Sequence, residues 1–143
     1  MPVRPNLASG VTATTPPAVE VLNKVAQVAR TDTARFDAFV LPKNAVVIGS
    51  YVVGGPISDA ATTATLTVGT GGSGTELINA FNVKTTAGYN PVGSAAGSHM
   101  GKQLTEDTLY KAVYAETGTA STTGGPWLVK VEYYIPAGGG GTY

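Results

Sequence analysis

Short apolar runs, each closed by glycine, proline or threonine, constrain the fold of this chain more than any other feature. Glycine occurs 19 times in 143 residues, whereas the helix formers Glu, Lys, Gln, Arg and Leu are scarce. Such a composition is typical of strands and turns, because branched and aromatic side chains fit a pleated sheet and glycine and proline supply turn conformations. We therefore expect an all-β fold, an antiparallel β-sandwich. Jelly-roll and immunoglobulin-like topologies are both compatible with this pattern, and we expect a jelly-roll-like sandwich.

The positions of the strands follow from the alternation of apolar residues. The strongest run is 45–53, which is apolar on both faces at its start and therefore predicts a central strand covered on both sides. The other expected strands are 21–28, 36–41, 65–68, 108–116 and 127–135. A short helix is the alternative for the first of these, and residues 75–81 form either one helical turn or a strand.

Alternation also assigns side chains to faces of the expected strands. In 36–41, one face carries Phe36, Ala38 and Val40, and the other carries Asp37, Phe39 and Leu41. Leu66 and Val68 are expected to point inward. The expected core face of the last strand is Trp127, Val129, Val131, Tyr133 and Ile135.

The chain divides into three parts by composition. Residues 1–17 hold four prolines and one charge, so they cannot pair regularly in a central strand and do not have the charge of a hydrophilic disordered tail. We expect an extended N-terminal arm that becomes ordered by lying on another surface. Residues 18–136 form the β-sandwich domain, with a long polar loop at 85–101, and residues 137–143 form a Gly-rich C-terminal tail.

Charge and cysteine content exclude several classes of function. Charged residues make up only 13% of the chain and the formal net charge is zero, so no general attraction to nucleic acid or to an anionic membrane is expected. The absence of cysteine excludes disulfides, zinc–thiolate sites and cysteine nucleophiles. No apolar run approaches the roughly 20 residues that a membrane span needs, and MPVRPNL has no secretory leader pattern.

The residues that could carry chemistry are few. His99, the single histidine, lies in the polar loop beside Ser98, but a catalytic triad also needs an orienting carboxylate, so an exposed loop histidine is the expected role. Glu106 and Asp107 lack the spacing of a calcium loop and are expected in a solvated turn. The glycine-rich run 69–74 lacks the Gly-Lys-Ser/Thr ending of a phosphate-binding loop. We predict no catalytic residue, no metal site and no cofactor.

Tyrosines are the remaining candidates for a binding surface. Tyr110, Tyr114 and Tyr134 lie on two expected strands and could form a protein interface or a platform for sugars. A position in the core is the equally weighted alternative for each of them. Trp127 is expected to anchor the core.

Three segments resemble the small capsid decoration, or cement, proteins of tailed bacteriophages. In that family a strand ends in Leu-Pro-Lys-Gly/Asn-Ala and a Val/Ile-rich strand follows, as in FDAFVLPKNAVVIG at residues 36–49. ATLTVG at residues 64–69 and VKVEY at residues 129–133 are also similar to it. The resemblance spans roughly residues 33–135 and does not include the N-terminal arm.

This resemblance implies a non-enzymatic virion protein that binds the outside of a capsid and bridges major capsid subunits. The implied partners are the major capsid protein and further copies of the chain, as a homodimer or homotrimer, with assembly in the host cytoplasm. A proline-rich arm can lie along a neighbour as an added strand or strap, and its expected contact residues are Val3, Arg4, Pro5, Asn6 and Leu7. The alternatives are a carbohydrate-binding module or a fibre or tail-tip adhesion domain and, last, a hydrolase of unusual design that uses His99.

Overall fold

The computed structural model describes residues 19–85, 90–92 and 99–136, and in these residues every regular element is a strand. The strands are β1 (Leu22–Val28), β2 (Phe36–Leu41), β3 (Val46–Val53), β4 (Thr63–Gly69), β5 (Ile78–Asn82), β6 (Asn90–Val92), β7 (Thr108–Thr117) and β8 (Trp127–Tyr134). No helix among the described residues has the length and hydropathy needed to cross a bilayer.

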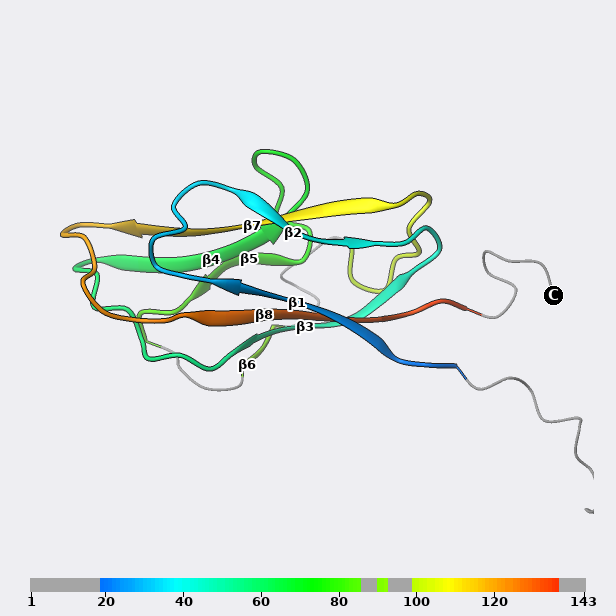
Figure 1. Cartoon of the computed structure of the whole chain (residues 1–143), viewed down its shortest axis with the longest axis horizontal. Coiled ribbons are helices and arrows are strands. Elements are labelled where there is room, and N and C mark those ends of the chain that lie inside the picture. Colours follow the sequence, from blue (N-terminus) through cyan, green and yellow to red (C-terminus); the bar gives the residue numbers. More distant parts are fainter. Residues whose placement is uncertain (1–18, 86–89, 93–98, 137–143) are drawn as a thin grey trace, which may run out of the picture.

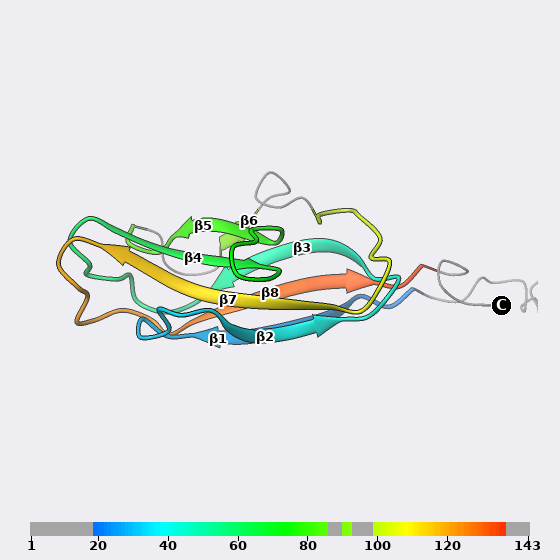
Figure 2. The same cartoon turned by 90° about the horizontal axis from the view of Figure 1, so that it is seen from above.

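Two antiparallel four-stranded sheets stack face to face, in the orders β1-β8-β3-β6 and β2-β7-β4-β5. The pairs β1–β8, β2–β7, β3–β6 and β4–β5 are antiparallel, so the chain forms one long hairpin that is folded over itself. This connectivity is that of a jelly roll, which confirms the expected sandwich and decides between the two topologies that the sequence left open. Figure 2 shows β1 and β2 at one edge of the sandwich and β5 and β6 at the other.

The core lies between the sheets and is formed by alternate residues of the long strands. On β8, Trp127, Val129, Val131 and Tyr133 are buried, as predicted, while Ile135 lies beyond the end of the strand and is 39% exposed. Leu66 and Val68 of β4 are fully buried, again as predicted. The other large, fully buried side chains are Val28, Leu41, Val47, Val52, Leu77, Ile78, Val83, Tyr110 and Tyr114.

Two β-bulges explain where the expected alternation fails. In β2 the register with β7 shifts between Asp37 and Phe39, so Val40 is 47% exposed and Leu41 is buried. In β3 the register with β8 shifts between Val47 and Gly49, which leaves Ile48 exposed. A bulge inserts one residue opposite a regular partner and reverses the faces beyond it. β3 is therefore central within its sheet, and Val46 and Val47 on opposite faces of its start are both buried, as expected; only Ile48 at the bulge is exposed.

The structure assigns the secondary structure of three segments for which the sequence left alternatives or predicted a loop. Residues 22–28 form a strand rather than a helix, and the segment 75–81 contributes the start of β5, also a strand. The expected loop 85–101 contains a strand, β6, that pairs with Ser50–Val52 of β3. β6 has only three residues, which is too short for alternation to reveal.

Candidate functional site: the open edge of the sandwich

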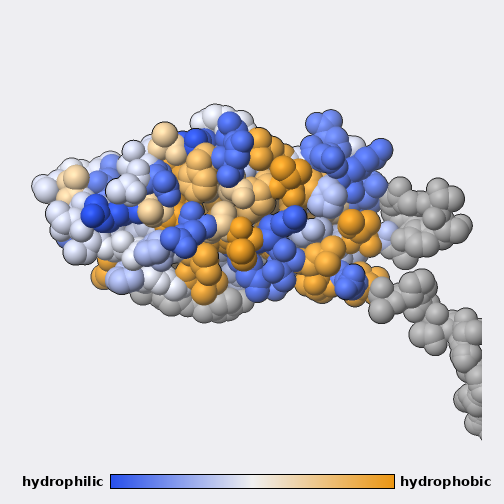
Figure 3. Space-filling model, viewed as in Figure 1, coloured by the Kyte–Doolittle hydropathy of each residue, from blue (hydrophilic) through white to orange (hydrophobic). Residues whose placement is uncertain are grey.

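The sandwich has an open edge where β1 and β2 lie side by side, because each is the terminal strand of its sheet. Among the described residues, β1 pairs only with β8 and β2 only with β7. Apolar side chains are exposed along this edge, as Figure 3 shows. They are Val19, Val21 and Val25 at β1, Val40 on β2 and Leu109 on β7. An apolar edge with unpaired backbone groups can bind another chain through main-chain hydrogen bonds.

The outer face of the β1-β8-β3 layer carries a small polar cluster formed by Tyr51, Lys130 and Glu132. The Tyr51 hydroxyl donates to Glu132 Oε1 at 2.9 Å, and Lys130 Nζ lies 3.3 Å from Glu132 Oε2 and 5.6 Å from the centre of the Tyr51 ring. The ring lies across Gly49, where a Cβ would be 2.6 Å from the tyrosine hydroxyl. This glycine therefore allows the ring to lie flat on the sheet. Sequence reasoning missed this cluster, because its members come from two strands that only the register brings together.

Replacing Tyr51 by phenylalanine is expected to lower the free energy of unfolding by about 0.5–1.5 kcal/mol, because it removes one hydrogen bond to a charged, partly exposed carboxylate. Urea denaturation of the two proteins measures the difference. Tyr134→Phe is the matched control: this tyrosine lies on the same outer face, and its hydroxyl bonds to none of the described residues. An equal loss in both variants would show that the contact with Glu132 contributes nothing of its own.

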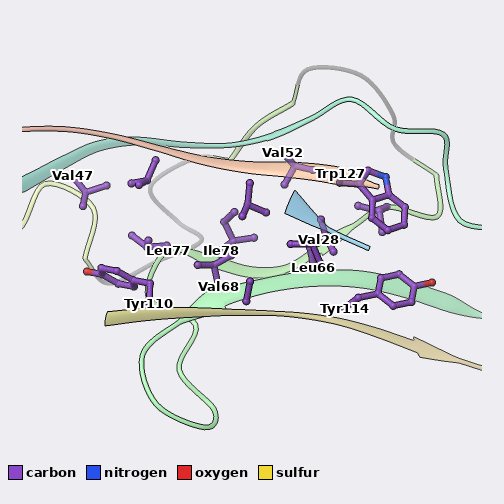
Figure 4. Close-up of a cluster of buried hydrophobic side chains, with 14 of the residues drawn as sticks. Val28, Val47, Val52, Leu66, Val68, Leu77, Ile78, Tyr110, Tyr114 and Trp127 are labelled. Atoms are coloured by element: carbon purple, nitrogen blue, oxygen red, sulfur yellow. The ribbon is translucent and has the colours of Figure 1, made fainter. Parts of the chain in front are cut away.

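Two of the three candidate interface tyrosines lie in the core. Tyr110 and Tyr114 are fully buried, and Figure 4 shows both rings between the sheets. Tyr114 stacks on Trp127, with ring centres 5.5 Å apart, and its hydroxyl donates to Glu116 Oε1 at 2.6 Å. Both tyrosines therefore take the core position that was the alternative to an interface. Tyr134 is half-buried on the outer face of its sheet, and its role in an interface stays a prediction.

His99 ties the loop that contains it to the sandwich. Its Nδ1 shares a hydrogen bond with the Tyr110 hydroxyl at 2.7 Å, and its backbone N–H donates to the carbonyl oxygen of Glu76 at 3.3 Å. Two residues later, the N–H of Gly101 donates to the carbonyl oxygen of Val47 at 2.8 Å. The Glu76 carboxylate accepts bonds from the backbone N–H and hydroxyl of Thr70, so it orients the glycine-rich turn rather than the imidazole. The half-buried His99 thus joins loop to core, which differs from the exposed position expected from the sequence.

The stability of the protein is expected to fall between pH 7.5 and pH 5.5 because of His99. Burial lowers the pKa of its imidazole, a shift that the Glu76 carboxylate opposes and the Lys102 ammonium adds to. As the pH falls, the unfolded chain binds a proton near pH about 6.5 while the folded chain still resists it, so the free energy of unfolding decreases.

Chemical denaturation at a series of pH values measures this slope. Since His99 is the single histidine, His99→Gln is expected to flatten the curve in this interval. An unchanged slope in that variant would assign the pH dependence to another group.

Asp107 and Asp59 accept hydrogen bonds that hold loops together. Asp107 accepts a hydrogen bond from the backbone N–H of Lys43 at 2.8 Å, which joins two neighbouring loops. Asp59 accepts bonds from the backbone N–H groups of Thr123 and Thr122 and from the Thr122 hydroxyl, and these bonds hold its carboxyl pKa well below the usual range. Among the described residues, no three metal-ligating side chains come together.

The predicted arm residues Val3, Arg4, Pro5, Asn6 and Leu7 lie outside the described residues, so their role in binding stays a prediction. The structure does show where the chain after residue 18 joins the sandwich. The chain enters β1 beside the end of β8, since Leu22 pairs with Tyr133, and the exposed valines of the open edge begin there. Sequence reasoning missed this edge, because isolated valines in a strand give no sign of whether a neighbouring strand covers them.

Comparison with solved structures identifies proteins of similar architecture. A chain of the cyanophage Pam1 capsid asymmetric unit has a TM-score of 0.62 and 25% sequence identity, and the match covers 92% of this chain and 98% of that chain. A chain of the capsid of Ralstonia phage GP4 has a TM-score of 0.53 and 21% identity, over 93% of this chain and 91% of that one; this second likeness concerns the fold alone. No protein-family model and no curated protein matches the sequence.

The likeness to the Pam1 capsid chain supports a structural role in a virion and an association with a capsid assembly. It also suggests a non-enzymatic protein. The similarity covers almost the whole of both chains and is therefore not restricted to one sheet or one hairpin.

Proposed function

We propose that this chain is a decoration protein that binds the outer surface of a phage capsid and bridges and stabilises major capsid subunits. The observation that carries the proposal is the likeness to a chain of the cyanophage Pam1 capsid over 92% of this chain. The resemblance of residues 36–49, 64–69 and 129–133 to decoration proteins supports the same role. The protein acts on the outside of the virion after assembly in the host cytoplasm, as a homodimer or homotrimer.

The physical basis of the proposed bridging is the combination of a rigid body with an extended arm. The sandwich has a closely packed core and few surface charges, so it can lie against another protein at a small desolvation cost. The arm, through Val3, Arg4, Pro5, Asn6 and Leu7, reaches beyond the body to a neighbouring subunit. Because many copies bind one shell, and linked copies bind it together, modest affinity at each contact is sufficient.

Addition of the purified protein to undecorated capsids tests the proposal. We expect saturable co-sedimentation with the capsid and an increase in the temperature at which the capsid releases its contents. An inactive control is the same protein after heat denaturation. Binding that does not saturate, or saturating binding without any gain in capsid stability, would contradict the bridging role.

The sugar-binding alternative loses most of its proposed platform. Tyr110 and Tyr114 are fully buried in the core, so neither ring is available to stack on a sugar. Of the three tyrosines only Tyr134 remains partly exposed. We therefore take the decoration role as the function that the geometry supports best.

A further inference from the structure

We propose that the free edge of β1 binds residues 8–15 of a second copy of this chain, which adds to the sheet as a new strand. The inference rests on the proposed role of residues 1–17 as a binding arm, and it names the receiving site and the partner. In this arrangement residues 3–7 remain free for the capsid. The argument has three parts, which concern the edge, the segment and the route between them.

The β1 edge is the less protected of the two strands at the open edge. Natural edge strands avoid adding partners by bulges, by proline or by charge. β2 has such devices, a bulge between Asp37 and Phe39 and the exposed charge of Asp37. β1 pairs with β8 in unbroken register over seven residues, contains no proline and carries one charge, Lys24. Its Val25 is 53% exposed beside the free backbone edge.

Residues 8–15 have the composition of a strand that could occupy this edge. The sequence ASGVTATT is free of proline, which is required for a strand that pairs along its length, and threonine and valine favour extended structure. An eight-residue strand is about 27 Å long, enough to cover the seven residues of β1, which span about 24 Å. The segment carries no charge, and the whole chain has a formal net charge of zero, so two copies do not repel each other.

The route between the segment and β1 favours a second copy over the chain's own edge. Pro16 and Pro17 have restricted φ angles and disfavour helical backbone in the residue before each of them, so the linker sequence is poorly suited to the tight turn that a return to the chain's own β1 would need. The six residues 16–21 span at most about 22 Å. The receiving β1 must therefore begin within that distance of the donor's β1, which requires two sandwiches whose open edges are neighbours.

Cross-linking in solution tests the proposal. The sequence has no native cysteine, so each introduced cysteine is the only thiol that can react. Two full-length single-cysteine variants, Val11→Cys and Val25→Cys, are mixed at high concentration and treated with a short bis-maleimide. We expect a covalent dimer whose cross-linked peptide joins positions 11 and 25. Asn79→Cys, exposed on β5 at the opposite edge, replaces Val25→Cys in the control and is expected to react at least tenfold less.

Two results would overturn the inference. Equal yields at positions 25 and 79 would show that the segment does not select the β1 edge. A monomeric, concentration-independent cross-link in the double variant V11C/V25C, with no dimer in the mixture, would show that the arm folds back on its own chain. Co-sedimentation of the same variants with capsids is measured separately. A failure of residues 8–15 to bind β1 of a second copy can therefore be distinguished from a loss of capsid binding.

Discussion

Deletion of residues 1–17 is expected to weaken binding to undecorated capsids by about a hundredfold or more, because it removes one of two linked contacts and with it the gain from simultaneous attachment. The sandwich itself should keep its stability, since the described core begins after the deleted segment at Val28. Co-sedimentation over a range of protein concentrations measures the affinity, and urea denaturation measures the stability.

Deletion of the Gly-rich residues 137–143 is the matched control, and capsid binding by this variant should equal that of the full chain. A shorter deletion of residues 1–7 separates the two proposed roles of the arm. It should weaken capsid binding while the cross-link between positions 11 and 25 persists. Undiminished capsid binding without residues 1–17 would refute the arm as a bridging element and leave the sandwich body as the binding surface.

Trp127→Ala is expected to lower the free energy of unfolding by about 3–5 kcal/mol, because it removes the largest buried side chain and leaves a cavity that a close-packed core cannot fill. Trp127 is fully buried and stacks on Tyr114 across the sandwich. Domains of this kind have about 5–15 kcal/mol of stability in total, so the variant is expected to be partly unfolded at 37 °C.

Urea denaturation followed by circular dichroism measures the loss. Leu128→Ala tests whether the effect comes from burial, since Leu128 is the next residue along β8 but lies on the outer face and is 40% exposed. Its substitution should change the stability by about 1 kcal/mol or less. Similar losses in the two variants would mean that the chain does not bury the face of β8 that the structure places in the core.

The exposed edge of β1 is consistent with a protein whose sheet gains a strand from a partner. Isolated chains with long, apolar, unprotected edges tend to associate, and natural proteins usually block such edges. Among residues 19–85, 90–92 and 99–136, the adjacent edge strand β2 carries a bulge and an exposed charge, whereas β1 pairs with no strand besides β8 and has no bulge. This difference suggests that the free edge is retained for binding, and it offers a physical reason why the protein would function as an assembly.

Much of the fold could be predicted from the order of residues along the chain. The alternation in 127–135 identified the buried face of β8 as far as Tyr133, and the threonine-and-leucine pattern of β4 identified Leu66 and Val68 as inward. These predictions succeeded because side chains alternate between faces in a regular strand. The prediction for β2 failed at its bulge, since one inserted residue reverses the faces and nothing in the local sequence marks it.

The candidate site was predictable only in part. The extended arm at residues 1–17 stays a prediction from proline content and low charge, because these residues lie outside the described part of the chain. The assignment of Tyr110 and Tyr114 to core or surface depended on which sheet lies opposite β7. The link between His99 and Tyr110 and the cluster of Tyr51 with Lys130 and Glu132 depend on register between distant segments.

By itself, the sequence determined the all-β class, the positions of the longer strands and the low charge. These properties depend on local backbone preferences and composition, which are visible residue by residue. The tertiary structure decided the jelly-roll connectivity, the burial of Tyr110 and Tyr114 and, within the described residues, the unpaired edge of β1. Pairing between strands far apart in the chain depends on the packing of the whole core, so no short segment specifies which strand is left without a neighbour.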